Sequence, residues 1–282
     1  MAVNRDSNAY TLVFATIMVI VVGGLLAFIS STLKPIQDEN VKQEKMQNIL
    51  QATGFWEEKD DLDRKTAGEV FNDYVIKRLT INANGDILAE KTKEDEIDPK
   101  DELEPFNIKP RKQYSTIIKP LITKHKGDPE ALYEAMKKEE KLYFPLFVCE
   151  KEGKRVFVTT FSGKGLWDDI WGYLGIAGDG RTVCGAIFDH KGETPGLGSK
   201  ITEEWFENQF YKDPKSGEPK KLSASEGGAY KPIKVKKPGN PLNDFKVDGI
   251  SGGTFTGVGV DEMMGRTMRV YYEFLLVNKD NI

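Results

Sequence analysis

The chain has 282 residues, of which 39% are hydrophobic and 30% are charged, so it can bury one good-sized core. Its net charge of −4 argues against a basic face for nucleic acid. It contains only two histidines and two cysteines, too few for any usual structural zinc or iron–sulfur site. We therefore expect neither nucleic acid as a partner nor a bound metal.

The N-terminal region contains a candidate membrane span. Residues 10–29 form 20 consecutive positions without a charge. At about 1.5 Å per helical residue they cover the ~30 Å hydrocarbon core of a bilayer. A signal peptide is the competing interpretation, but its apolar core is only about 7–15 residues long, and no good Ala-x-Ala cleavage site follows here. We therefore expect an uncleaved transmembrane helix at 10–29, after a short N-terminal segment at 1–9. Pro35 then predicts a helix break, followed by an amphipathic stretch that ends at Gly54.

Beyond this region, hydrophobic periodicity predicts hairpins and helices. Asn84-Gly85 and Glu152-Gly153 are typical of hairpin turns. Residues 89–104 are dense in charge and lack apolar periodicity, which indicates a solvated loop. Antiparallel hairpins with helices laid against them predict an α+β domain over 30–282. The expected helices cover 64–74, 128–141, 201–211 and 258–276, and the expected strands cover 79–81, 87–88, 143–149, 155–160, 182–188 and 233–236.

One segment near the C-terminus carries candidate chemistry. After Asp248, small residues and a glycine pair leave the hydroxyl of Thr254 with little around it. Gly252 and Gly253 can adopt positive φ, and exposed N–H groups in such a turn suit an anionic group such as a phosphate. The alternative is an ordinary helix start, in which a hydroxyl of this segment caps the helix expected at 258–276.

The segment Asp248-Gly249-Ile250-Ser251-Gly252-Gly253-Thr254 resembles the flavinylation motif Asp-x-x-(Ser/Thr)-Gly-Ala-Thr, with glycine in place of the usual alanine. The resemblance implies that Thr254 accepts FMN through a phosphoester bond, with Thr256 as the fallback. Two further segments, the turn at 165–167 and the loop at 193–198, resemble those of the FMN-binding C subunit of the Na+-translocating NADH:quinone reductase. The resemblance covers the N-terminal anchor, the helix after it, and everything from about residue 154 onward. Residues 90–145 have no recognised counterpart and are expected to be an insertion.

The resemblance implies a flavin site, and the sequence itself contains no set of residues that favours ordinary acid–base or nucleophilic catalysis. The sequence has no nucleophile elbow, no phosphate-binding Gly-Lys-Ser/Thr and no dinucleotide fingerprint, so the chain is not expected to bind NADH itself. Its chemistry would come from the flavin, with the protein supplying attachment and orientation. The implied cofactor-binding residues are Thr254 as the covalent acceptor, Asp248, Ser251, Gly252, Gly253, Trp167, Thr194, Gly196, Leu197 and Gly198.

The resemblance also implies a role. The chain would be an electron-transfer subunit of a Na+-pumping NADH:ubiquinone reductase, taking electrons from an iron–sulfur partner and passing them to a second FMN subunit on the way to quinone. A periplasmic FMN transferase would be a further partner. Two alternatives remain: the G subunit of an Rnf-type complex, which shares the loop at 193–198 more than the turn at 165–167, and a membrane-anchored binding module whose Ser-Gly-Gly-Thr is only a helix cap.

The orientation of the domain is predicted differently by charge and by resemblance. Arg5 is the only basic residue before the membrane span, whereas Lys34, Lys42 and Lys45 follow it, and this count favours a cytoplasmic domain. The resemblance implies a single-pass protein of the inner membrane with a periplasmic domain. We expect the periplasmic placement, because large domains translocate largely regardless of such counts.

The remaining candidate side chains are expected to be structural. Cys149 and Cys184 each lie in an apolar, strand-like run, where a buried neutral thiol is the usual state, although an oxidising compartment would allow them to pair. His190, at the end of an expected strand, could form a proton-shuttling pair with Glu193. We expect it instead to be an ordinary hydrogen-bonded residue.

Overall fold

The computed structural model describes residues 7–56, 62–213, 216–223, 227–239, 243 and 245–282. The chain divides into two compact units, Met1–Lys45 and Met46–Ile282. The expected N-terminal segment at 1–9, including Arg5 of the charge count, lies largely outside the described residues. The units are described separately below.

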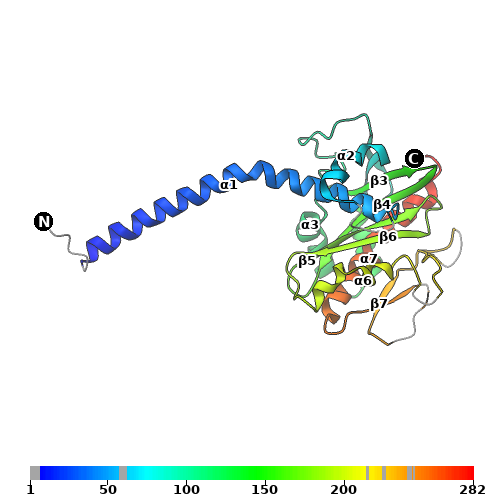
Figure 1. Ribbon diagram of the computed structural model, residues 1–282. Coiled ribbons are helices and arrows are strands. Elements are labelled where there is room, and N and C mark those ends of the chain that lie inside the picture. The colour runs from blue at the N-terminus through cyan, green and yellow to red at the C-terminus, as the bar shows by residue number, and fades with distance from the viewer. Residues whose placement is uncertain (1–6, 57–61, 214–215, 224–226, 240–242, 244) are drawn as a thin grey trace. The chain divides into compact units, whose positions relative to one another are not determined.

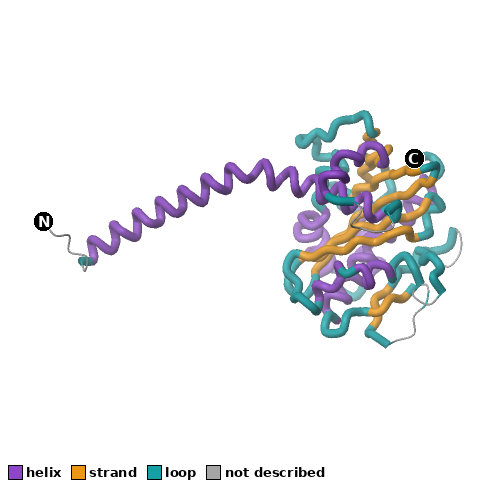
Figure 2. Tube along the Cα trace, in the orientation of Figure 1, coloured by secondary structure: helices purple, strands orange, loops and turns teal. Residues whose placement is uncertain are grey.

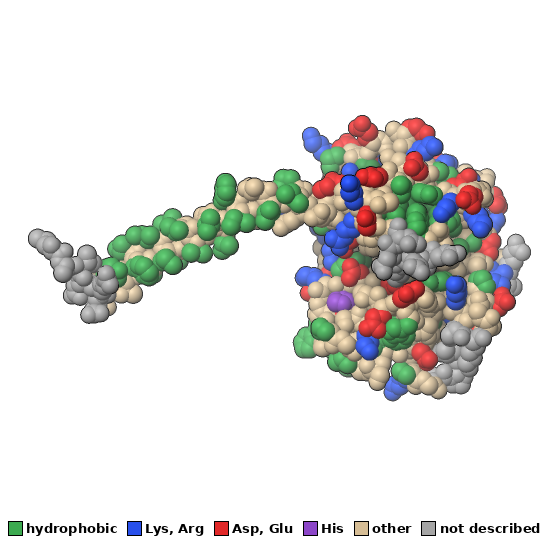
Figure 3. Space-filling view, in the orientation of Figure 1, with side chains coloured by type: hydrophobic (Ala, Val, Ile, Leu, Met, Phe, Trp, Pro, Cys, Tyr) green, Lys and Arg blue, Asp and Glu red, His purple; other side chains and the backbone are tan. Residues whose placement is uncertain are grey.

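The first unit consists of most of helix α1 (Asn8–Ala52), which by length and composition could cross a membrane. Its apolar side chains, such as Leu12 and Phe28, are exposed (Figure 3). The predicted break at Pro35 is wrong, because the helix continues through it. A proline removes one backbone donor and favours a kink, but helix-forming residues on both sides allow the helix to go on.

The second unit begins with the last turns of α1. Met46, Ile49 and Leu50 are buried, which confirms the amphipathic stretch. The chain then turns at Gly54, which has a φ of +69°. A Cβ at this position would lie 2.6 Å from the carbonyl oxygen of Cys184, so both the turn and the close approach favour glycine.

A six-stranded sheet in the order β2-β1-β3-β4-β5-β6 forms the centre of this unit, and every neighbouring pair is antiparallel (Figure 1). The predicted turns at Asn84-Gly85 and Glu152-Gly153 are confirmed and join β1 to β2 and β3 to β4. The strands are β1 (Val75–Ile81), β2 (Ile87–Thr92), β3 (Phe144–Lys151), β4 (Lys154–Lys164), β5 (Asp169–Ala177), β6 (Val183–His190) and a separate parallel pair, β7 (Lys234–Lys236) and β8 (Lys246–Asp248).

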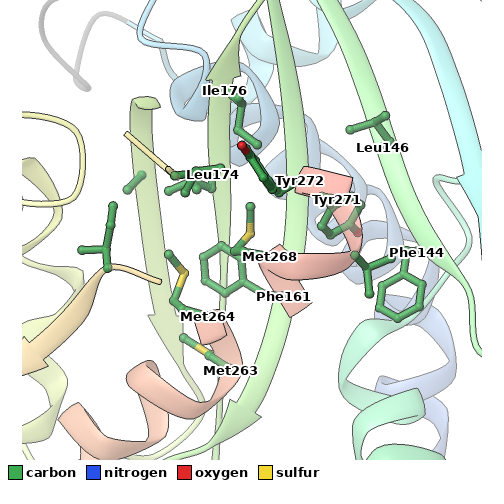
Figure 4. Close-up of a cluster of buried hydrophobic side chains, with 14 of the residues drawn as sticks. Phe144, Leu146, Phe161, Leu174, Ile176, Met263, Met264, Met268, Tyr271 and Tyr272 are labelled. Carbon is green, nitrogen blue, oxygen red and sulfur yellow. The ribbon is translucent and has the colours of Figure 1, made fainter. Parts of the chain in front are cut away.

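Helices cover both faces of the sheet, which confirms the α+β prediction (Figure 2). Residues of β3 alternate between two cores: Leu146 packs with helix α7 (Thr254–Asn278), and Phe147 packs with the end of α1 and with helix α2 (Arg64–Tyr74). Figure 4 shows the α7 core, where methionines of the helix lie against Phe161 of β4. The shorter helices are α3 (Pro110–Gln113), η2 (Tyr114–Ile118), α4 (Lys119–Lys124), α5 (Pro129–Lys137), η3 (Gly198–Thr202) and α6 (Glu204–Asn208).

Strand β5 was not predicted, and two of its glycines lie where other parts of the chain approach closely. A Cβ at Gly172 would lie 2.6 Å from the ring of Phe161, and one at Gly175 would lie 2.0 Å from the carbonyl oxygen of Ala52. These glycines let a helix and an aromatic ring press against the strand. The predicted helix at 201–211 is also only partly correct. It is a 3-10 turn followed by the short α6, in which Phe206 is buried but Trp205 is exposed rather than on the apolar side.

The charged segment 89–104 differs from the expected solvated loop. Strand β2 continues to Thr92, and Glu104 at the far end of the segment is buried. Its carboxylate accepts hydrogen bonds from Arg78 of β1 at 2.8 and 3.2 Å, and Arg78 also donates to the carbonyl oxygens of Thr92 and Asp95. A buried arginine therefore fastens this loop to the sheet, a pairing that a count of charges could not distinguish from a solvated surface.

Candidate functional site

The N-terminus of helix α7 has no side-chain cap among the described residues. The N-cap is Gly253, and no described side chain forms a capping hydrogen bond there. The interpretation of Ser251, Thr254 or Thr256 as the cap is therefore wrong. Thr254 is the first residue of the helix and is exposed, and its hydroxyl has no hydrogen-bond partner among the described residues.

The first turn of α7 also offers backbone donors. The first N–H groups of any helix lack an intrahelical acceptor, and together they give the helix start a partial positive charge. In the described chain, no side chain caps the N–H groups of Thr254 and the next residues. Such a helix start suits a phosphate group.

Thr256 lies on the opposite side of the helix. Only 1% of it is exposed, and its hydroxyl donates to the Oε2 of Glu193 at 2.5 Å. Two residues along a helix correspond to a rotation of about 200°, so an inward Thr256 leaves Thr254 outward. Of the two threonines weighed from the sequence, only Thr254 presents a free hydroxyl to a reacting partner.

The loop expected to contact a flavin lies against the motif at 248–254. A Cβ at Gly252, which has a φ of +76°, would lie only 2.6 Å from the Cδ2 of Leu197. The turn at 165–167 joins the same loop, because the indole Nε1 of Trp167 donates to the Oγ1 of Thr194 at 3.0 Å. Gly196 also has a φ of +76°, and Gly198 begins the 3-10 turn after the loop. The structure thus brings together three segments that are well separated in the sequence.

Large apolar side chains on these segments are exposed to solvent. Trp167 is 65% exposed and Leu197 is 42% exposed. Trp167 is therefore not a core residue. Leu166, Phe255 and Val258 are exposed as well, and none of the three was predicted as a site residue. Phe255 follows Thr254 directly, so the first turn of α7 carries an exposed aromatic ring as well as the exposed hydroxyl.

Glu193 occupies the centre of this arrangement and was not predicted as a site residue. It is 4% exposed, and it accepts hydrogen bonds from the N–H groups of Leu166, Trp167 and Asp168 at 3.3, 2.9 and 3.4 Å, in addition to the bond from Thr256. Burial alone would raise the pKa of its carboxyl group. The hydrogen bonds outweigh burial, and the pKa lies below its usual range.

The expectation that His190 is an ordinary hydrogen-bonded residue is confirmed. The Nδ1 of His190 accepts from the backbone N–H of Glu193 at 3.3 Å, so the histidine supports the start of the loop. Both cysteines are free: Cys149 is buried and Cys184 is partly buried, and burial raises the pKa of the Cys184 thiol to about 11. Among the described residues, no cluster of potential ligands could hold a metal ion.

The remaining motif residues have distinct surroundings. Asp248 ends β8; its N–H donates to Gln209 at 2.8 Å, and its Oδ1 is buried without a partner in the described chain. Ser251 is exposed. A Cβ at Gly253 would lie 3.0 Å from the side chain of Ile250, which gives a physical reason for glycine where the flavinylation motif has alanine.

Known proteins are similar to this chain over the site and beyond it. The model of the FMN-binding domain matches residues 165–269, a range that contains the three segments of the site. The C subunit of the Na(+)-translocating NADH-quinone reductase from Neisseria meningitidis is 24% identical over 91% of this chain and 88% of its own length. The corresponding protein of Vibrio parahaemolyticus is 28% identical over 92% and 90%.

A solved structure agrees with these relatives. The crystal structure of the C subunit from Parabacteroides distasonis has a TM-score of 0.60 and 27% identity, covering 86% of this chain and 96% of that one. This chain therefore has an FMN-binding domain and is, over most of its length, a homologue of proteins named as the C subunit of the Na+-translocating NADH-quinone reductase.

Proposed function

We propose that this chain is the electron-transfer flavoprotein subunit of a Na+-translocating NADH:quinone reductase and that it carries FMN esterified to Thr254. The observation that carries the proposal is the helix start of α7. There an exposed hydroxyl without a partner in the described chain stands among uncapped N–H groups, inside the range that matches the FMN-binding domain.

The residues present fit both the phosphate and the ring system of FMN. The helix start provides donors for the phosphate, and Gly252 adopts the positive φ of the turn that leads into it. Exposed Trp167, Leu197 and Phe255 provide apolar surface for a flat ring system. In the attachment, the hydroxyl oxygen of Thr254 would attack the FMN phosphorus of a flavin dinucleotide supplied by the transferase. The P–O bond of its pyrophosphate would break, and the nucleoside monophosphate would leave with the hydroxyl proton, so the chain gains the mass of FMN less one water.

When bound, the flavin supplies reversible electron transfer, and the protein supplies the setting. Thr254 holds the cofactor permanently, and the N–H groups of the α7 start solvate the remaining phosphate charge. Leu197 and Trp167 lie on the loop and turn that would border the ring and reduce its contact with water. Thr194 holds the indole of Trp167 in place through the 3.0 Å hydrogen bond.

The partners and placement follow from the same proposal. The chain would take electrons from an iron–sulfur partner, pass them to a second FMN subunit, and receive its own flavin from a periplasmic transferase. Residues 10–29 would anchor it in the inner membrane after a cytoplasmic segment at 1–9, with 30–282 in the periplasm and 90–145 as an insertion. The relatives and the solved structure above bear the name of the Na+-translocating complex, which favours this complex over an Rnf-type one.

Complementation tests the proposed function. A strain that lacks the gene should lose Na+-stimulated NADH:quinone reductase activity in its membranes, and the wild-type chain should restore it. Thr254→Val should be inserted at the wild-type level without restoring activity, whereas Thr123→Val, which changes an exposed threonine of α4, should restore it. Full activity of the Thr254→Val strain would reject the proposal.

A further inference from the structure

A single buried carboxylate connects the three segments of the site. The Oε1 of Glu193 accepts from the N–H groups of Trp167 and Asp168, and its Oε2 accepts from the N–H of Leu166 and from the hydroxyl of Thr256. All four partners are donors. An ionised carboxylate, which has only acceptor sites, is the side chain that satisfies them together.

Two glycines leave the space that this carboxylate occupies. A Cβ at Gly165 would lie 2.5 Å from the Oε1 of Glu193, and a Cβ at Gly198 would lie 2.5 Å from its Oε2 and 2.4 Å from the Oγ1 of Thr256. Neither glycine has a positive φ, so close approach, rather than backbone conformation, explains them. One glycine belongs to the turn at 165–167 and the other to the loop at 193–198, so both segments are shaped around the same side chain.

We propose that Glu193 is a positioning residue for the flavin site. It holds the Trp167 turn, the 194–198 loop and the first turn of α7 in one arrangement, and it reaches the helix through Thr256. Because Thr256 is bound inward, Thr254 two residues earlier faces outward on the other side of the helix. The inference rests on the proposed function for its purpose, but the bonds that carry it belong to this chain alone.

The proposal makes glutamine a disruptive substitution. The amide group of a glutamine would place donor hydrogens against at least one of the N–H or hydroxyl donors that now face a carboxylate oxygen. Hydrogen bonds to a charged group contribute more than neutral ones. In Glu193→Gln, the 165–167 turn and the first turn of α7 should therefore separate from residue 193 more frequently than in wild type. Gly198→Ala should disrupt the contact between Glu193 and Thr256 without changing any charge, because its new methyl group would separate the two side chains.

Each variant has a matched control. Glu140→Gln removes the same charge from an exposed side chain in the part of the chain before β3. Gly192→Ala adds the same methyl group one residue before Glu193, where the nearest atom is 3.8 Å away and φ is not positive. All four variants are made in the full-length chain in detergent, once without an FMN transferase and once with it.

The first measurement is amide hydrogen exchange of the flavin-free chain. In Glu193→Gln and Gly198→Ala, the amides of residues 166–168 and 257–259 should exchange at least about tenfold faster than in wild type, the factor expected when bonds to a charged group are lost. Amides of β3 and β4 should keep their wild-type rates. The two controls should match wild type throughout.

The second measurement follows attachment and the bound flavin. Both junction variants should be labelled more slowly by the transferase than wild type, and their flavin absorption spectra should differ from wild type, while the controls reproduce it. Wild-type exchange at 166–168 together with a wild-type spectrum in both variants would overturn the inference. Faster exchange across the whole sheet would also overturn it, because it would mean a general loss of stability. A wild-type chain that is never labelled would instead reject the proposed function, and the exchange data would still decide the role of Glu193.

Discussion

At the scale of single residues, the two threonines of the site have opposite surroundings. Thr254 is exposed with a hydroxyl that is free within the described chain, and Thr256 is buried with its hydroxyl bound to Glu193. A transferase needs access to the oxygen that it modifies. Exposure therefore favours Thr254 over Thr256, which the sequence offered as the fallback acceptor.

Substitution of the two threonines should therefore have different effects. Thr254→Val should abolish covalent flavin, because the other hydroxyl in the first turn of α7, that of Thr256, is buried against Glu193. Thr256→Val should still carry the label. Intact mass measured after expression with a flavin transferase decides between them. A label lost in Thr256→Val and kept in Thr254→Val would move the attachment site two residues along.

The apolar residues at the site should shape the environment of the flavin without being needed for attachment. Leu197→Ala and Trp167→Ala should keep the covalent label and should shift the flavin absorption, because truncation lets water reach the ring. The cost to stability should be small, well below the about 3–5 kcal/mol typical of a buried aromatic, because Trp167 is 65% exposed. Spectra identical to wild type in both variants would place the ring elsewhere.

At the scale of elements, local patterns predicted what depends on neighbours in sequence. The hairpin turns at Asn84-Gly85 and Glu152-Gly153 and the long C-terminal helix follow from turn residues and periodicity. Strand β5 and the helical segment at 110–124 were missed, because the first contains glycines that serve tertiary contacts and the second has a π-helical turn in its middle. At the site, the motif indicated Thr254. The role of Glu193 depends on a partner 63 residues away, which no local pattern reveals.

The charged loop after β2 provides a test at this scale. Glu104→Ala would leave the guanidinium of Arg78, itself buried, without its carboxylate, and breaking such a pair typically costs about 3–5 kcal/mol. Glu102→Ala, at an exposed position of the same loop, should change the free energy of unfolding by less than about 0.5 kcal/mol. Urea denaturation of both variants measures the difference. Equal stabilities would mean that the pair does not hold the loop to the sheet.

At the scale of the whole molecule, the proposed flavin attachment depends on which side of the membrane the second unit occupies. The charges flanking the apolar span favour the cytoplasm, whereas attachment of flavin by a periplasmic transferase requires the opposite side. Alkaline phosphatase fused after Ile282 should be active and green fluorescent protein fused there should be dark. The reverse result would place the domain in the cytoplasm and would make attachment by that enzyme impossible.

The central claim is a covalent flavin on this chain, and the most direct measurement is made on full-length protein purified from its native host. After denaturation and electrophoresis, the band should fluoresce under ultraviolet light, and its intact mass should exceed that of the polypeptide by one FMN less one water. Fragmentation should place this added mass on the peptide that contains Thr254. A colourless band with the mass of the unmodified polypeptide would contradict the account.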